Sequence, residues 1–319
     1  MIPDLKTIET AADRIRSYIH RTPVLTSHGI NEMLGADIHF KCENFQKAGA
    51  FKSRGACNAV FSLDEADVAK GVATHSSGNH AQALARAAGI RGCKAYIVMP
   101  ENSSRVKVDA VKAYGGEITF CRPTLLSREE TLLEVINRTG ASEIHPYNDY
   151  RVIAGQASAA LELFEEIGQP DMIMAPVGGG GLLSGTALAT LYLSPSTKVI
   201  AAEPTKADDA FRSFTSRQLV PSVNPQTIAD GLLTSLGTLT FPIILDHVQQ
   251  IMTVQEKTII RAMRLCWERM KIIIEPSSAV PLAAIIEKPG YFRGKKVGII
   301  ISGGNVSLDK LPWISKHNL

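Results

Sequence analysis

The chain has 319 residues, of which 45% are hydrophobic and 20% are charged, a composition typical of a globular protein with a large core. The net charge of +3 is small and basic residues are mixed with acidic ones, which argues against nucleic acid as a partner. The longest apolar runs, such as 297–301, are too short to span a membrane and the first residues show no secretion signal, so we expect a cytoplasmic protein.

Hydrophobic periodicity predicts alternating helices and strands along the chain. In the first half we expect helices at 7–18, 53–63, 81–88, 104–114 and 128–137, and strands at 37–42, 71–75, 95–99 and 117–121. In the second half we expect helices at 155–167, 182–193 and 255–270, and strands at 171–177, 198–203 and 296–301. This alternation predicts an α/β fold with parallel sheets covered by helices. We place a small domain at 71–148, inserted into a large domain formed by 1–70 and 149–319.

The cysteines are five in number, widely scattered, and contain no CxxC pair. This pattern argues against a zinc site or a disulfide framework and favours reduced thiols. The five are Cys42, Cys57, Cys93, Cys121 and Cys266.

Lys52 follows Phe51 and has small, apolar neighbours within the segment 44–56. A lysine in a desolvated place loses its proton more readily and becomes a nucleophile toward carbonyl groups. An ordinary surface lysine at the start of a helix is the alternative, and the local sequence leaves that choice open.

Four consecutive glycines, 178–181, lie between a predicted strand and a predicted helix. There the backbone N–H groups and the positive end of the helix can hold a phosphate without any side chain. No Lys-Ser/Thr pair follows, so a nucleoside-triphosphate loop is not expected, and Leu183 stands where a dinucleotide motif needs its last glycine. The alternative to phosphate binding is that the four glycines only form a tight turn.

Two polar turns follow predicted strands. Residues 76–80 offer hydroxyls, an amide and backbone donors at the start of a helix, on the edge of a parallel sheet where ligands of open α/β folds bind. Residues 302–305 present Ser302 beside two glycines at the end of the last strand. A helix cap and a plain turn are the respective alternatives.

Together, the segments 49–56, 76–82, 178–181 and 302–305 resemble the fold-type II pyridoxal-phosphate (PLP) enzymes, and within them serine racemases and catabolic serine/threonine dehydratases. The order and spacing agree over nearly the whole chain. The resemblance implies open, mostly parallel sheets in a large and a small domain, an active site between them, and a homodimer. It also implies no isoleucine feedback, because the chain shows no appended regulatory domain like that of biosynthetic threonine deaminases.

The resemblance assigns the cofactor contacts. It implies that Lys52 binds PLP as a Schiff base beside Phe51, that Asn79 bonds the phenolic oxygen and that Ser302 faces the pyridine nitrogen. A neutral hydroxyl at that nitrogen stabilises a pyridinium less than a carboxylate would, so the ring is a moderate electron sink. The phosphate is held by Gly178, Gly179, Gly180 and Gly181.

The same resemblance implies the substrate contacts. The turn Ser76, Ser77, Gly78, Asn79 and His80 takes the substrate carboxylate, and His75 and Arg128 match racemase-like positions. Ser77 stands opposite Lys52 in racemases, whereas many threonine dehydratases have no hydroxyl residue there, so Ser77 favours racemase activity. The alternatives are that Ser77 caps the helix and that Arg128 is an exposed charge at a helix start.

Further sites follow from the resemblance. Glu203, Ala207 and Asp209 match a divalent-cation loop whose oxygen ligands suit magnesium or calcium, the alternative being a helix that begins at 208–209. Animal racemases bind ATP at a subunit contact. The matching residues are Lys47, Gln82, Tyr114 and Asn305, but Ala48 and the pair 28–29 depart from that pattern, so nucleotide regulation stays open.

We therefore predict a PLP-dependent serine racemase with serine/threonine dehydratase activity through a shared Cα carbanion. Lys52 takes the α-proton; return of a proton from Ser77 inverts the centre, and loss of the β-hydroxyl, assisted by the cofactor phosphate, leads to a 2-oxo acid and ammonia. One alternative is a threo-3-hydroxyaspartate dehydratase that uses Arg128 or His75 for the second carboxylate. The other is a non-catalytic protein that binds PLP or amino acids.

Overall fold

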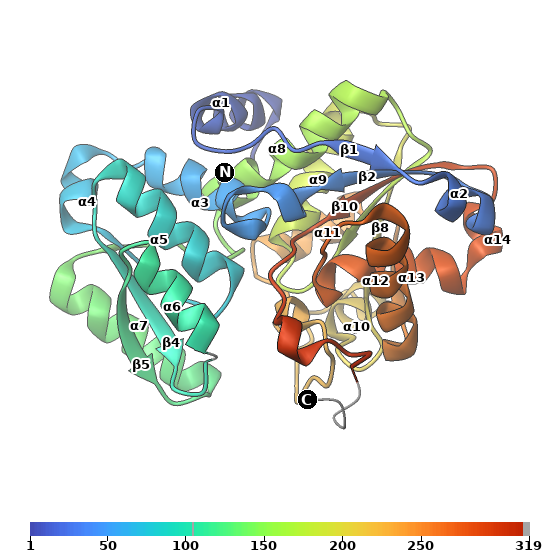
Figure 1. The fold of residues 1–319 in the computed structure, drawn as a ribbon. Helices are drawn as coiled ribbons and strands as arrows, with labels where there is room; N and C mark the ends of the chain where they lie inside the picture. Colours follow the sequence, from blue (N-terminus) through green and yellow to red (C-terminus); the bar gives the residue numbers. More distant parts are fainter. Residues whose placement is uncertain (104, 315–319) are drawn as a thin grey trace.

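The computed structural model describes residues 1–103 and 105–314 (Figure 1). Its helices are α1 (Leu5–Ile15), α2 (His28–Leu34), α3 (Lys52–Phe61), α4 (Glu65–Lys70), α5 (Asn79–Arg91), α6 (Arg105–Ala113), α7 (Leu125–Thr139), α8 (Tyr150–Ile167), α9 (Gly181–Leu193), α10 (Asp209–Ser216), α11 (Thr240–His247), α12 (Glu256–Met270), α13 (Pro276–Glu287) and α14 (Pro289–Phe292). Its strands are β1 (Val24–Thr26), β2 (Asp37–Cys42), β3 (Val72–His75), β4 (Ala95–Pro100), β5 (Glu117–Cys121), β6 (Ser142–Glu143), β7 (Met172–Pro176), β8 (Lys198–Pro204), β9 (Gln250–Val254) and β10 (Lys296–Ile301). Two short 3-10 helices, η1 (Glu43–Phe45) and η2 (Lys47–Gly49), precede α3.

The strands form two separate sheets. The larger has the order β1-β2-β10-β7-β8-β9 and is parallel except for its edge strand β1, and the smaller has the order β5-β4-β3-β6 and is entirely parallel. In Figure 1 the smaller sheet and helices α4 to α7 form one lobe on the left, and the larger sheet lies in the other. The predicted α/β fold is confirmed. The domain boundaries at 70/71 and 148/149 stay a prediction.

Helix α3, which begins at Lys52, is packed between α5 of the smaller lobe and α8 of the larger one. Ala56 and Val60 share an apolar cluster with Leu84 of α5 and Ile97 of β4. On the other side α3 meets α8, where a Cβ at Gly155 would lie 2.7 Å from the Arg54 carbonyl oxygen. The close backbone approach that glycine permits therefore fixes α3 against the larger lobe.

Several predicted boundaries are wrong. Helix α5 continues through Gly89 and ends at Arg91, because the next residue, Gly92, has the left-handed φ of +78° that ends helices. Helix α7 begins at Leu125, because the Thr124 side chain accepts a hydrogen bond from the Ser127 N–H and caps it there. Ser104, the first residue of another predicted helix, lies outside the described residues, and α6 is described from Arg105.

Some elements were not predicted at all, among them α11, α13 and β9. Helix α13 shows the reason most clearly. It carries Pro281 in its interior, and residues 277–285 are all buried, so it lacks the polar face that reveals an amphipathic helix. Helix α10 was considered only as the alternative to the cation loop, and the structure confirms a helix that begins at Asp209.

The described helices include none long and apolar enough to cross a bilayer. All five cysteines are free thiols, as predicted, and four of them are buried.

Candidate active site

Lys52 begins α3, and its amine is held inside the molecule. The ammonium donates a hydrogen bond to the Pro146 carbonyl oxygen at 2.6 Å and lies 5.1 Å from the centre of the Phe51 ring. Burial lowers the pKa of Lys52 to about 8, and the carboxylate of Glu275 opposes that shift. Near neutral pH about a tenth of this lysine is therefore the neutral, nucleophilic amine, far more than of an ordinary exposed lysine.

Two neutral histidines with fixed tautomers lie near Lys52. The Ile144 carbonyl can only accept, so the His80 Nε2 at 3.0 Å must carry the proton, which leaves Nδ1 as an acceptor. In His145, Nδ1 accepts the N–H of Asn148 at 2.9 Å, so Nε2 carries the proton. Burial lowers the pKa of His80 to about 3 and of His145 to about 4. Both rings are therefore uncharged at neutral pH.

His75 and Arg128 come together beside His145. The rings of His75 and His145 meet edge to face at 6.0 Å, and burial together with the Arg128 charge lowers the pKa of His75. Arg128 lies within the first turn of α7, not at its start, and is partly buried. Its Nε is buried without a hydrogen-bond partner, so the interpretation as an exposed charge is wrong.

The turn 76–79 is free of side-chain capping. The Ser76 hydroxyl accepts the Gly78 N–H at 3.3 Å, and α5 is capped by Gly78 without any side-chain hydrogen bond. The alternative that Ser77 caps this helix is therefore wrong. Since the first N–H groups of a helix lack partners within it, the turn can bind a carboxylate.

Asn79 belongs to a polar network that the sequence did not predict. Its amide donates to both carboxylate oxygens of Glu275 at 3.0 Å, and its carbonyl accepts from Asn305 at 2.8 Å. Burial raises the pKa of Glu275 to about 7. The assignment of Asn79 to the phenolic oxygen stays a prediction, and it requires an amide hydrogen that here binds Glu275. A carboxylate following an apolar run, at 272–275, was the available signal.

The turn after β10 lies against the Lys52 segment. The Phe51 N–H donates to the Ser302 carbonyl at 3.0 Å, and Ala50 pairs with Gly303. The Ser302 hydroxyl is buried and lies 2.9 Å from the hydroxyl of Ser278, a residue that the sequence did not single out.

The glycine loop leaves no room for side chains. A Cβ at Gly179 would lie 2.3 Å from the Tyr147 ring, and one at Gly181 2.9 Å from its Cβ. Gly180 has a φ of +89°, and a Cβ there would collide with Thr240. Because α9 starts at Gly181, its first N–H groups adjoin a loop made only of backbone. This arrangement fits the phosphate group of PLP. Tyr147 was missed because only the fold brings it to the glycines.

The predicted cation ligands meet where β8 leads into α10. Glu203 accepts the N–H groups of Ala210 at 3.3 Å and of Phe211, and so caps α10. Burial raises the pKa of Glu203 to about 9 and that of Asp209 to about 6, and the Asp209 Oδ2 is buried without a partner. Ala207, which lies between Glu203 and Asp209 in the chain, is also buried. The orphaned oxygen fits a cation, although among the described residues no three His, Cys, Asp or Glu side chains gather into a metal cluster.

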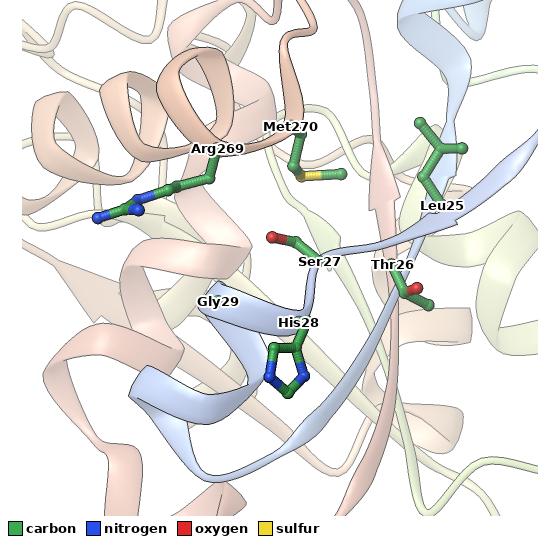
Figure 2. A pocket seen from close by; sticks show the side chains of 7 residues that line it. All are labelled: Leu25, Thr26, Ser27, His28, Gly29, Arg269 and Met270. Carbon is green, nitrogen blue, oxygen red and sulfur yellow. The ribbon is translucent and has the colours of Figure 1, made fainter.

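The four nucleotide candidates are only partly connected. Asn305 donates to the Ala48 carbonyl at 2.8 Å, next to Lys47, whereas Gln82 is buried in α5 and Tyr114 is 37% exposed. None of the four lines the cavity of about 510 Å³ shown in Figure 2. Its lining residues are Leu25, Thr26, Ser27, His28, Gly29, Arg269 and Met270.

Comparison with known proteins agrees with this geometry. The family model described as pyridoxal-phosphate dependent enzyme matches residues 15–303. The chain is 53% identical to a beta-hydroxyaspartate dehydratase of Paracoccus denitrificans over 98% of this chain and 99% of the relative. It is 52% identical to a serine racemase of Dictyostelium discoideum over 97% of each chain. The structure of maize serine racemase superimposes with a TM-score of 0.95 at 45% identity, over 97% of this chain and 95% of that one. The fold is that of fold-type II PLP enzymes, and the chain belongs to the family of pyridoxal-phosphate dependent enzymes.

Proposed function

We propose that this PLP-dependent enzyme is a serine racemase that also dehydrates serine and threonine to 2-oxo acids and ammonia. The observation that carries the proposal is Lys52, an amine with a pKa of about 8 at the start of α3, close to neutral histidines. The similarity to serine racemases over nearly the whole chain supports the choice of substrate.

Each part of the site has a role in this proposal. When bound, PLP withdraws electrons from the Cα of the attached amino acid. Lys52 takes the α-proton, and Ser77, which caps no helix, returns a proton on the opposite face. The N–H groups of the turn 76–79 hold the substrate carboxylate, and Ser302 presents a neutral hydroxyl supported by Ser278.

A second candidate is the dehydration of threo-3-hydroxyaspartate. Arg128 favours this candidate, because its Nε is buried without a hydrogen-bond partner. The guanidinium lies close to the uncharged ring of His75, which does not neutralise its charge. A guanidinium there can bind a second carboxylate. The dehydratase of Paracoccus denitrificans supports this candidate.

The test is to measure released ammonia and product chirality with serine, threonine and the hydroxyaspartate isomers. We expect D-serine and pyruvate from L-serine. Turnover of a hydroxyaspartate isomer without any turnover of serine would replace the first proposal by the second.

A non-catalytic binding protein is the remaining alternative. It predicts that Lys52→Ala keeps PLP bound as before, whereas we expect the absorbance of lysine-bound PLP, at roughly 410 nm, to disappear together with turnover. A spectrum of the two purified proteins decides between these outcomes.

Further properties are proposed on the sequence resemblance. We propose a homodimer in the cytoplasm and a magnesium or calcium ion held by Glu203, Ala207 and Asp209, which the orphaned Asp209 oxygen supports. ATP regulation through Lys47, Gln82, Tyr114 and Asn305 stays open.

A further inference from the structure

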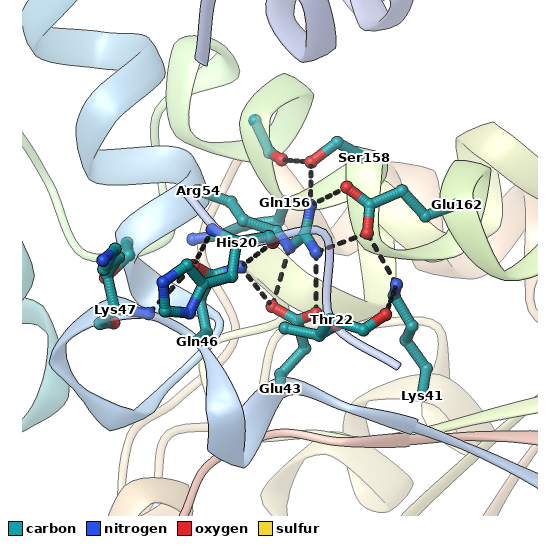
Figure 3. Close-up of polar contacts among 12 residues, drawn as sticks. His20, Thr22, Lys41, Glu43, Gln46, Lys47, Arg54, Gln156, Ser158 and Glu162 are labelled. Atoms are coloured by element: carbon teal, nitrogen blue, oxygen red, sulfur yellow. Dashed lines mark hydrogen bonds and ion pairs between the residues drawn. The ribbon is translucent and has the colours of Figure 1, made fainter. Parts of the chain in front are cut away.

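A group of four buried charges lies next to the Lys52 segment, outside the active site described above (Figure 3). This charge cluster consists of Lys41 on β2, Glu43 in η1, Arg54 on α3 and Glu162 on α8. The first three residues have no exposed surface and Glu162 is 9% exposed. With two cations and two anions, the cluster carries no net charge.

Arg54 is the centre of the cluster and uses all of its donors. Its Nε and Nη2 bind the two Glu43 oxygens at 2.7 and 2.8 Å, and its Nη1 and Nη2 bind the two Glu162 oxygens at 2.7 Å. The remaining Nη1 hydrogen binds the Ser158 hydroxyl at 3.1 Å. All five N–H groups of the guanidinium are therefore satisfied.

The other charges are paired as well. Lys41 donates to Glu162 and to the Thr22 carbonyl, both at 2.6 Å, and the Thr22 hydroxyl donates to Glu43. The cluster thus joins β2, η1, α3 and α8 through charge-assisted hydrogen bonds, which are short and directional.

The position of the cluster suggests a role in addition to stability. Arg54 follows Lys52 by two residues in the first turn of α3, so whatever holds the Arg54 side chain also fixes the direction of that turn. A buried ion cluster often stabilises a fold no better than apolar residues of the same size would. We therefore expect the charge cluster to fix the arrangement of the segments that it joins, more than to raise the stability of the fold.

We propose that the charge cluster is a positioning device for Lys52, which holds the first turn of α3 against β2 and α8 and adds no net charge to the interior beside the Lys52 segment. The proposal rests on the proposed function of Lys52. It extends the active site to residues that touch neither the substrate nor the cofactor.

Neutrality matters because a buried charge acts over a long range in the protein interior. An added positive charge disfavours the ammonium form of Lys52, and an added negative charge favours it. The titratable groups that face the Lys52 amine are Glu275 before α13, His80 on α5 and His145 after β6.

The test changes the charge of the cluster in both directions. Glu162→Gln makes it +1 and leaves Arg54 bound to Glu43, whereas Lys41→Met makes it −1 and leaves Glu162 bound to Arg54. The double variant is neutral again. Glu165→Gln is the matched control. Glu165 lies on the same helix, α8, as Glu162, and the substitution breaks only its exposed ion pair with Arg21.

The measurement is the pH dependence of Lys52 acetylation in the full cofactor-free chain, by competitive labelling and mass spectrometry. We expect the midpoint to fall in Glu162→Gln and to rise in Lys41→Met, each by about half a pH unit or more. The double variant and Glu165→Gln should titrate like the wild type.

Two results would overturn the proposal. Equal midpoints in all variants would show that the cluster does not act on Lys52, and shifts in one direction for both single variants would indicate general loosening. If one single variant does not fold, the other decides together with the double variant: a shift in its expected direction beside an unchanged double variant supports the proposal, and an unchanged midpoint in the single variant contradicts it. Since no substrate or cofactor is used, an enzyme inactive on serine would leave this result intact.

Discussion

The charge cluster and the residues around Lys52 differ in how completely their buried polar atoms are paired. Every charged atom of Lys41, Glu43, Arg54 and Glu162 has a hydrogen-bond partner. Near Lys52, by contrast, the His80 Nδ1 and the Arg128 Nε are buried without one. Because buried polar groups are normally paired, the orphaned atoms indicate where a ligand binds, and the saturated ones indicate where one geometry is held.

The largest expected effect contrasts two arginines. Arg54→Met leaves Glu43 and Glu162 without their main partner, so we expect a loss of about 3–5 kcal/mol in the free energy of unfolding. Arg128→Met removes no paired group, and we expect less than about 0.5 kcal/mol. Urea denaturation of both variants measures the difference, and equal losses would show that the contrast in pairing has no energetic meaning.

The next effect concerns Ser77, whose side chain does not cap α5. If Ser77 returns the proton, Ser77→Ala should lower racemisation of serine by about 10²-fold or more and change dehydration only a few-fold. Chiral chromatography and ammonia release, measured on the same samples, separate the two reactions. Ser76→Ala is the control within the same turn, and an equal loss of both reactions would remove Ser77 from the proton-transfer role.

The glycine loop offers a test of close packing at the site. Gly179→Ala places a Cβ 2.3 Å from the Tyr147 ring, and we expect a loss of about 1–3 kcal/mol in stability together with weaker PLP binding. Gly290→Ala is the matched control, because nothing lies within 4 Å of its Cβ. Thermal unfolding and PLP titration report the two effects. Unchanged PLP affinity in Gly179→Ala would argue against the phosphate site.

The smallest effect is a pH dependence. The pKa of Lys52 is lowered to about 8, so its neutral fraction grows as the pH rises toward that value. We expect the rate of PLP capture by the cofactor-free protein to rise by about tenfold per pH unit below it and to level off above it. In Glu275→Gln the midpoint should fall further, because that carboxylate raises the pKa of Lys52. Stopped-flow absorbance measures the rate, and a midpoint near 10 would contradict a desolvated lysine.

The same contrast shows why parts of the site were predictable and others were not. Lys52, the turn 76–80 and the four glycines are continuous in sequence, so each carries its own pattern. Glu275 and Tyr147 contribute through contacts with residues far along the chain. No local pattern marks Tyr147, and the apolar run before Glu275 does not say which residue its carboxylate binds. The capping of α10 by Glu203 likewise depends on the fold, because a side chain of β8 meets the N–H groups of Ala210 and Phe211 in the first turn of α10.

The sequence by itself determined the alternation of strands and helices, the family resemblance and the segments that carry Lys52, Ser77 and the glycines, because periodicity and short motifs depend on neighbouring residues. Only the tertiary structure decided how much of each side chain is buried and which polar atoms have partners. Burial sets the pKa of Lys52. The pairing of polar atoms leaves the Arg128 Nε without a hydrogen-bond partner and gives every N–H group of the Arg54 guanidinium one. Both properties depend on desolvation and on hydrogen bonds between distant segments, which exist only after the chain has folded.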